Sequence, residues 1–189
     1  MHQARHGPWP GQAEFDYLDD LILDRDGADH SSLAALCRIV NQQRLIASSL
    51  NIRGGHQVVS FTAVPLDELH ELRTFRSHLA RWDFEPFGIC IKRDWLEELG
   101  ARSVQYGDDQ LWETLLPDDQ PFFQVGQTSS KSGQQPINWT AEREWRHVGD
   151  IDLRHVPNDA ALLFTPSKSD ARQLADISRW PIAIVESEA

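Results

Sequence analysis

The chain contains 189 residues, and its 18 Lys and Arg against 29 Asp and Glu give a formal net charge of −11 with His neutral. This length suits one domain, the 40% hydrophobic and 25% charged composition is typical of a globular protein, and two cysteines exclude a disulfide scaffold or a cysteine zinc site. The acidic balance disfavours non-specific nucleic-acid binding. Because no apolar run approaches the ~20 residues of a membrane span and no signal-like leader is recognisable, we expect a cytoplasmic protein with no membrane partner.

The N-terminal region begins with a polar arm. Residues 1–14 are rich in Pro, Gly, His and Gln without any period, so we expect a flexible arm, pinned only by Trp9, before a single domain over 15–189. The apolar run Leu21–Leu23 stands among aspartates and is followed by a turn signal at Asp26 and Gly27. This pattern predicts a short buried strand.

The middle of the chain alternates helical and extended patterns. Apolar residues at helical spacing predict a helix over 31–45, with Asp29 or Ser31 as its cap. The further elements that we expect are a strand at 57–62, a helix beginning at Pro65, a strand at 87–91, a helix at 94–99 and a strand at 103–106.

The C-terminal third opens with a polar segment. Residues 126–138 have no apolar period and predict a mobile loop. The elements expected after it are strands at 142–148, 161–165 and 182–185, with a helix at 169–177 between the last two. Several strands follow one another directly, which favours an α+β fold over a doubly wound parallel sheet.

Two glutamates of the late strand are the first candidates for chemistry. On a strand, Glu142, Glu144 and Arg146 share one face, and two carboxylates about 7 Å apart repel each other unless a cation lies between them. Such a pair can bind a polar substrate and stabilise positive charge that develops in a transition state. The alternative is a charge ladder with Arg143 and Arg146, as on any edge strand.

Five further residues are candidates for binding. The hydroxyls of Ser60 and Thr62 share one strand face and can bind a ribose or an amide, or they form ordinary cross-strand pairs. Arg25 can bind a diphosphate with two hydrogen bonds, or it forms an ion pair with the neighbouring aspartates. His30 and His56 can orient a ligand as hydrogen-bond donors, although a histidine beside a helix start is more often a neighbour of the cap.

Motif searches exclude several common sites. The sequence has no GxGxxG, Walker, HExxH or GxSxG motif, and no His, Cys and Asp set has the spacing of metal ligands. Cys37 and Cys90 stand in apolar patterns, so we expect both in the core.

The order of several segments resembles a group of bacterial proteins, with little assigned chemistry, that are similar to the AbiGi-type abortive-infection proteins. The resemblance covers roughly residues 20–155. Its segments are Asp29–Ser31, Ile52–His56, Val59–Thr62 with Pro65–Leu66, Pro86–Ile89, Gly100–Tyr106 and Trp139–Arg146.

A second resemblance is to the ADP-ribosyltransferase superfamily, whose arginine-type members carry an Arg, a Ser-x-Ser/Thr strand and a Glu-x-Glu pair in this order. Arg25, Ser60-Phe61-Thr62 and Glu142-Arg143-Glu144 follow that order here. The resemblance implies a split, mostly antiparallel sheet with flanking helices, and NAD as the cofactor-like substrate.

The same resemblance implies a role for each candidate. Glu144 would hold the ribose and offset the developing positive charge, and Glu142 would orient the acceptor. Arg25 would hold the diphosphate, with His30 and His56 as further NAD-binding residues, and Ser60 and Thr62 would brace the strand and the ribose. No metal is implied.

The leading hypothesis is therefore an enzyme that transfers ADP-ribose from NAD to an acceptor macromolecule, as a phage-defence toxin with a cognate inhibitor protein as a further partner. The alternative is a non-enzymatic binding or regulatory module of a defence system, whose acidic surface engages a basic partner. A third hypothesis is a nuclease-like toxin that uses carboxylates and a divalent ion.

Overall fold

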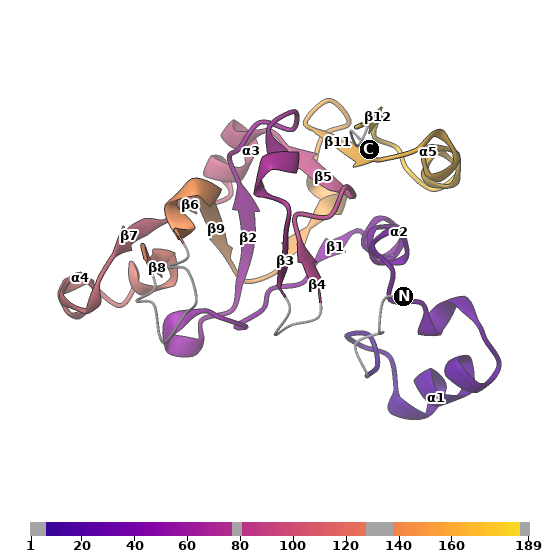
Figure 1. The fold of residues 1–189 in the computed structure, drawn as a ribbon, viewed down its shortest axis with the longest axis horizontal. Coiled ribbons are helices and arrows are strands. Elements are labelled where there is room, and N and C mark those ends of the chain that lie inside the picture. Colours follow the sequence, from indigo (N-terminus) through magenta and orange to yellow (C-terminus); the bar gives the residue numbers. More distant parts are fainter. Residues whose placement is uncertain (1–6, 77–80, 128–137, 186–189) are drawn as a thin grey trace.

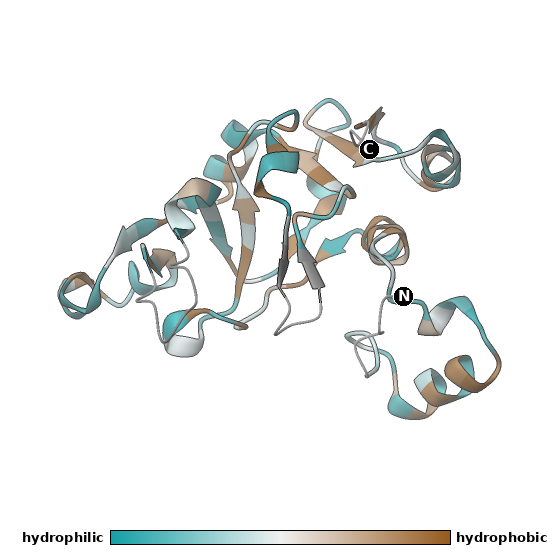
Figure 2. Cartoon of the chain, in the orientation of Figure 1, coloured by the Kyte–Doolittle hydropathy of each residue, from teal (hydrophilic) through white to brown (hydrophobic). Residues whose placement is uncertain are grey.

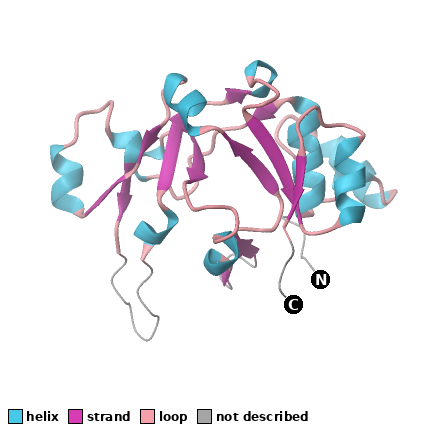
Figure 3. Ribbon diagram, turned by 90° about the horizontal axis from the view of Figure 1, so that it is seen from above, coloured by secondary structure: helices cyan, strands magenta, loops and turns pink. Residues whose placement is uncertain are grey.

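The computed structural model describes residues 7–76, 81–127 and 138–185 (Figure 1). Strands form the middle of the molecule, and helices lie at both ends (Figure 3). The fold is α+β, as the sequence predicts, and most of its strand pairs are antiparallel.

The first element is a helix, so the strand expected at Leu21–Leu23 is wrong. Helix α1 (Glu14–Ile22) includes most of the apolar run, and Glu14 and Asp16 in its first turn complement the helix dipole. Leu21 and Leu23 are about half exposed. A three-residue apolar run fits either structure, and here it continues a helical pattern that begins at Phe15.

Helix α2 (Ser32–Gln42) confirms the helix predicted over 31–45, although it ends earlier. The Ser31 hydroxyl accepts a hydrogen bond from the Ala34 N–H (3.2 Å), which caps the helix. Gln43 then adopts φ 51°, which ends the helix and starts β1 (Arg44–Leu45). This strand pairs with β10 (Ile151–Asp152) in a small antiparallel sheet.

Two three-stranded sheets form the centre of the fold. In the first, β2 (Val58–Thr62) pairs with β9 (Glu144–Val148), which pairs with β6 (Arg102–Ser103). In the second, β12 (Ile182–Ile184) pairs in parallel with β11 (Ala161–Thr165), which pairs in antiparallel with β5 (Gly88–Ile91). Helix α5 (Lys168–Ala175) connects β11 to β12. The strands predicted near 57–62, 87–91, 161–165 and 182–185 are thus confirmed, as is the helix near 169–177.

Shorter elements complete the chain and bring three corrections. Residues Leu69–Leu72 form only a 3-10 turn instead of the helix expected from Pro65, and β3 (Thr74–Arg76) and β4 (Arg81–Asp83) follow as a pair. The strand expected at 103–106 divides at Val104, because β6 pairs with β9 whereas β7 (Gln105–Gly107) pairs with β8 (Phe123–Val125). Helix α3 (Arg93–Glu98) confirms the helix at 94–99, and α4 (Asp109–Thr114) lies beside β7.

The third correction concerns the late strand. Glu142 ends a 3-10 turn (Trp139–Glu142), and Arg143 adopts φ 47°, so the strand begins only at Glu144. Glu142 therefore does not share a strand face with Glu144. Most of the loop expected at 126–138 lies outside the described residues.

The core lies between α2, the second sheet and the β1–β10 pair. Hydrophobic residues gather on α2 and on the central strands (Figure 2). Fully buried members include Val40, Ile151, Leu153, Leu163 and Leu174.

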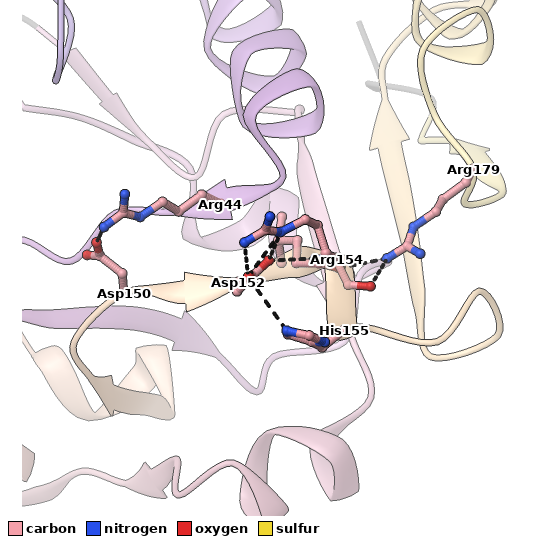
Figure 4. Close-up of polar contacts among 7 residues, drawn as sticks. Arg44, Asp150, Asp152, Arg154, His155 and Arg179 are labelled. Carbon is pink, nitrogen blue, oxygen red and sulfur yellow. Dashed lines mark hydrogen bonds and ion pairs between the residues drawn. The ribbon is translucent and has the colours of Figure 1, made fainter.

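Charged residues fasten the β1–β10 pair to the end of the chain (Figure 4). Asp150 accepts hydrogen bonds from the Ala47 N–H (2.6 Å) and from Arg44. Asp152 accepts from the Arg154 side chain and peptide N–H. Arg179 donates to the carbonyls of residues 153, 154 and 156, which connects this turn to the C-terminal segment.

Candidate functional site

A cavity of about 630 Å³ lies where the two central sheets approach each other. Strand β2 of one sheet and β5 of the other both line it. Its volume is in the range of about 300–1,000 Å³ that is typical of small-molecule sites. Its lining is mainly apolar and includes five aromatic residues: Phe61, Phe84, Phe87, Trp145 and Phe164.

Strand β2 turns an open edge away from its partner β9. In an antiparallel pair, residues alternate between hydrogen-bonded and non-hydrogen-bonded positions. The Ala63 N–H donates to the Arg143 carbonyl (3.1 Å), which extends the β2–β9 ladder and fixes this alternation. The peptide groups of Ser60 and Thr62 consequently point away from β9, at the edge where β2 borders the cavity.

Strand β5 likewise has an edge that is turned away from its partner, β11. The Lys92 N–H donates to the Ala160 carbonyl (2.8 Å). Because hydrogen-bonded positions alternate, the peptide groups of Gly88 and Cys90 also point toward β11. The peptide groups of Phe87, Ile89 and Ile91 point to the other edge, and all three residues line the cavity. The edge strands β2 and β5 therefore both offer main-chain donors and acceptors to the same cavity.

The side chains of the first sheet divide between its two faces. Directly opposed residues share a face, so Phe61 and Trp145 lie on one face while Thr62 and Glu144 lie on the other. Phe61 packs against the core beside the cavity. Residues of both faces therefore border the cavity, with Phe61 and Trp145 on one face and Thr62 and Glu144 on the other.

Glu144 is held by a buried arginine. The Arg146 Nε lies 2.8 Å from Glu144 Oε1, and Nη2 lies 2.9 Å from Oε2. Arg146 is only 1% exposed and also donates to the carbonyls of Pro121 and Phe123 and to the Gln124 side chain. The charge-ladder interpretation thus describes Glu144 and Arg146, whereas the expected pair of facing glutamates does not form.

Tyr106 borders the same pair of residues. Its hydroxyl oxygen accepts a hydrogen bond from the Glu144 N–H (2.8 Å). Burial raises the pKa of Tyr106, and the nearby carboxylates of Glu144 and Glu142 raise it further, against the hydrogen bond and Arg146. The phenol is therefore neutral at physiological pH and fixes the start of β9.

Glu142 is positioned through β2. The Thr62 hydroxyl donates to the Glu142 carbonyl (2.6 Å) and accepts from the Val64 N–H (3.1 Å). Glu142 is half-buried and lines the cavity, as do Thr62 and the exposed Ser60. Four of the residues expected to act together, Ser60, Thr62, Glu142 and Glu144, thus meet at one cavity.

The other three expected site residues do not line this cavity. Arg25 is exposed and lies 3.9 Å from Asp20, as its ion-pair interpretation predicts. It follows α1, which lies apart from β2 and β9 (Figure 1). An early arginine and a late glutamate therefore do not share this pocket.

The two histidines have packing positions elsewhere. The His30 ring stacks on the Trp9 ring, with centroids 4.1 Å apart. The guanidinium of Arg38 also lies over the Trp9 ring, 4.8 Å from its centroid. This stack fastens the N-terminal arm to α2. His56 lies in the turn after Arg53, close to Gly54, where any added Cβ would come within 2.7 Å of its Nε2 atom.

Sequence reasoning missed two charged residues of the cavity. Arg93, at the start of α3, supplies the only basic side chain among the described lining residues, and its guanidinium lies 5.3 Å from the Trp145 ring centroid. Glu85 adds a third carboxylate and lies 3.6 Å from Arg73. Glu85 and Arg93 stand on either side of the strand predicted at 87–91. This position beside a strand was the only feature of the sequence that could have pointed to them.

Phe84 is a strained residue of the lining. Its φ of 54° lies in the left-handed region, which bulky residues rarely adopt. Such backbone conformations persist only where the surrounding structure holds them, and they gather at binding sites.

Comparison of the chain with protein-family models, with curated proteins and with solved structures finds no match. Within residues 7–76, 81–127 and 138–185, no helix has the length and apolar character to cross a membrane. The same ranges contain no group of three His, Cys, Asp or Glu side chains arranged to hold a metal.

Proposed function

We propose that the cavity between β2 and β5 binds the nicotinamide end of NAD, and that the protein transfers ADP-ribose from NAD to an acceptor macromolecule. The observation that carries this proposal is the lining itself, in which five aromatic residues and three glutamates, Glu85, Glu142 and Glu144, border one cavity. The nicotinamide ring of NAD is flat and positively charged. Aromatic faces and carboxylates both attract such a ring.

The open strand edges support the same assignment. A carboxamide needs one donor and one acceptor in a plane, and the peptide groups of Ser60, Thr62 and Ile89 offer both at the cavity. The order of Ser60, Thr62, Glu142 and Glu144 agrees with the resemblance to ADP-ribosyltransferases, whose split sheet we propose for this chain.

The proposed reaction develops positive charge on the ribose and needs a carboxylate beside it. The bond between ribose C1′ and the nicotinamide nitrogen breaks, its electron pair moves to the ring, and the ribose becomes oxocarbenium-like. An acceptor nucleophile then forms a bond to C1′ and loses its proton to a base or to water. Glu142 lines the cavity, and the Thr62 hydroxyl fixes its backbone there, so Glu142 is the carboxylate that we assign to offset the developing charge, an effect of about 3–4 kcal/mol for one preorganised group.

Arg93 takes the role first given to Arg25. A guanidinium at the cavity can bind a diphosphate with two hydrogen bonds. The Arg93 guanidinium lies over the Trp145 ring, 5.3 Å from its centroid, and Arg93 lines the cavity. The resemblance to abortive-infection proteins supports a phage-defence role for the activity, in which an inhibitor protein controls the toxin.

The test is incubation of the purified chain with NAD labelled in its adenylate part and a cell lysate, with release of nicotinamide measured in parallel. We expect label on a macromolecule, and we expect Glu142→Gln to lower turnover by roughly 100- to 1,000-fold, the equivalent of the charge effect above. Arg25→Ala is the matched control and should leave turnover unchanged. NAD that neither binds nor is consumed would refute the proposal, as would a fully active Glu142→Gln variant.

A further inference from the structure

Helix α1 exposes an apolar face to solvent. Phe15 is 72% exposed, Leu18 45%, Leu21 52% and Ile22 77%, and Leu23 at the end of the helix is 55% exposed. These five residues, the α1 apolar face, lie within nine positions of one another. Exposed apolar side chains are normal when scattered, but a contiguous group of this kind marks an interaction surface.

The rest of the N-terminal segment holds α1 from its other side. Tyr17 is buried and meets the His30 ring edge-on, with centroids 5.7 Å apart. Asp20 accepts a hydrogen bond from Gln12 Nε2 (3.0 Å) and lies 3.9 Å from Arg25. Because these contacts fasten the opposite side, the α1 apolar face is left exposed. Figure 2 shows α1 at the periphery of the molecule, with hydrophobic residues in brown.

The spacing of the face fits a groove. Phe15, Leu18 and Ile22 stand at positions i, i+3 and i+7, the spacing at which a helix inserts anchors into an apolar groove of another protein. The helix has no basic residue in its last turn, and Glu14 and Asp16 are exposed in its first. Asp24 and Asp26, which follow the helix, are exposed as well.

We infer that α1 docks into an apolar groove of a partner protein, and that Lys and Arg side chains border that groove. Charge complementarity favours such a partner protein over a second copy of the chain and over a membrane surface. A second copy of the chain would bring one acidic border against another, and like charges at an interface are costly. An anionic membrane surface would repel the same border, since helices that bind it carry Lys and Arg.

The inference concerns a surface outside the NAD cavity, because none of the α1 apolar face lines that cavity. The inference therefore does not rest on the proposed NAD activity.

The experiment places a photo-reactive benzophenone side chain at Leu18 in the full chain and irradiates it in cells that encode the protein. The matched control carries the same group at Leu116, which is 67% exposed and lies in the segment after α4. We expect one protein to be cross-linked from position 18 and not from position 116. That protein is then purified and titrated with the chain.

The titration must show both parts of the inferred chemistry. We expect Ile22→Asp to weaken binding by about tenfold or more, as for an anchor residue, with the fold retained because the side chain is exposed. Added salt and the double variant Glu14→Lys, Asp16→Lys should each weaken binding. Leu116→Asp should leave it unchanged.

Four results would overturn the inference. They are cross-linking to a second copy of the chain with a doubled mass in light scattering, sedimentation of the chain with lipid vesicles, cross-linking from position 18 no stronger than from position 116, and a partner whose affinity does not respond to salt. NAD turnover of Ile22→Asp should equal that of the unmodified chain, so failure here and failure of the proposed activity are distinguishable.

Discussion

The guanidinium of Arg146 binds both carboxylate oxygens of Glu144, two residues earlier on the same face of β9, at 2.8 and 2.9 Å. Its remaining donors reach three oxygens of the 121–124 segment. One buried cation therefore joins β9 to the segment that leads into β8. A substitution of Glu144 consequently affects folding as well as any chemistry at the cavity.

We expect Arg146→Met to destabilise the protein by about 3–5 kcal/mol, because removal of one partner of a buried ion pair leaves the other without compensation. The free energy of unfolding from urea titration measures this. Arg154→Met is the matched control, since Arg154 also pairs with an aspartate two residues earlier but is exposed. Its unfolding midpoint should barely move, and equal effects of the two substitutions would contradict a structural role for burial.

A second expectation concerns Gly88, which lies opposite Phe164 in the β5–β11 ladder. A Cβ at this position would meet Phe164 ring atoms at 2.6 Å. Gly88→Ala should therefore cost about 1–3 kcal/mol through overpacking, as seen in the thermal unfolding midpoint.

Gly7→Ala is the control, because nothing lies within 4 Å of its added Cβ. In a double-mutant cycle, Gly88→Ala should cost less in the Phe164→Leu background than in the unmodified chain, since the smaller side chain makes room. An equal cost in both backgrounds would mean that the ring is not the cause.

Acid should weaken the β1–β10 connection. The peptide N–H of Ala47, followed by the Arg44 side chain, lowers the pKa of Asp150. The folded chain thus binds this proton less tightly than the unfolded chain does. The carboxylate stabilises the fold above the ordinary aspartate pKa near 4, and that contribution is lost as the pH falls through the lower folded pKa.

The measurement is the free energy of unfolding of the unmodified chain and of Asp150→Asn from neutral to strongly acidic pH. We expect the variant to be less stable at neutral pH and the two curves to converge in acid. Curves that stay parallel throughout would show that Asp150 carries no such contribution.

The cavity can be probed without any turnover assay. Cys90 lines it, and burial raises the pKa of this thiol. In a Cys37→Ser background, where Cys90 is the one remaining thiol, alkylation should be slow at mildly alkaline pH and should accelerate as the pH rises. Saturating NAD should slow it further by covering the sulfur.

The reciprocal Cys90→Ser variant supplies the control. Burial and then Asp29 raise the pKa of Cys37, which does not line the cavity, so NAD should leave its alkylation rate unchanged. Protection of neither thiol would count against NAD binding in this cavity.

The local sequence pattern was sufficient to predict an element where residues only a few positions apart determine its structure. The Ser31 cap, the apolar spacing of α2 and the β-branched run of β2 were all recognisable, because capping and periodicity are short-range effects. The same reasoning was wrong at Leu21–Leu23 and after Pro65. Short apolar runs fit more than one structure there, and long-range packing chose between them.

The residue types of the candidate site could also be selected from the sequence, whereas their grouping could not. Thr62 and Glu142 are 80 positions apart, and one hydrogen bond between them places the glutamate at the cavity. Arg25, His30 and His56 were equally plausible by residue type. Strand pairing left them outside the cavity and brought Arg93 to it instead.

An acidic α+β chain with strands near those of β2, β5, β11 and β12 follows from composition and periodicity, which are properties of the residues themselves. The register of β9 on β2, the burial of Arg146 and the opening between β2 and β5 follow from contacts between residues far apart in the chain. Each of those contacts depends on the others, because a hydrogen-bond ladder and a packed core form together.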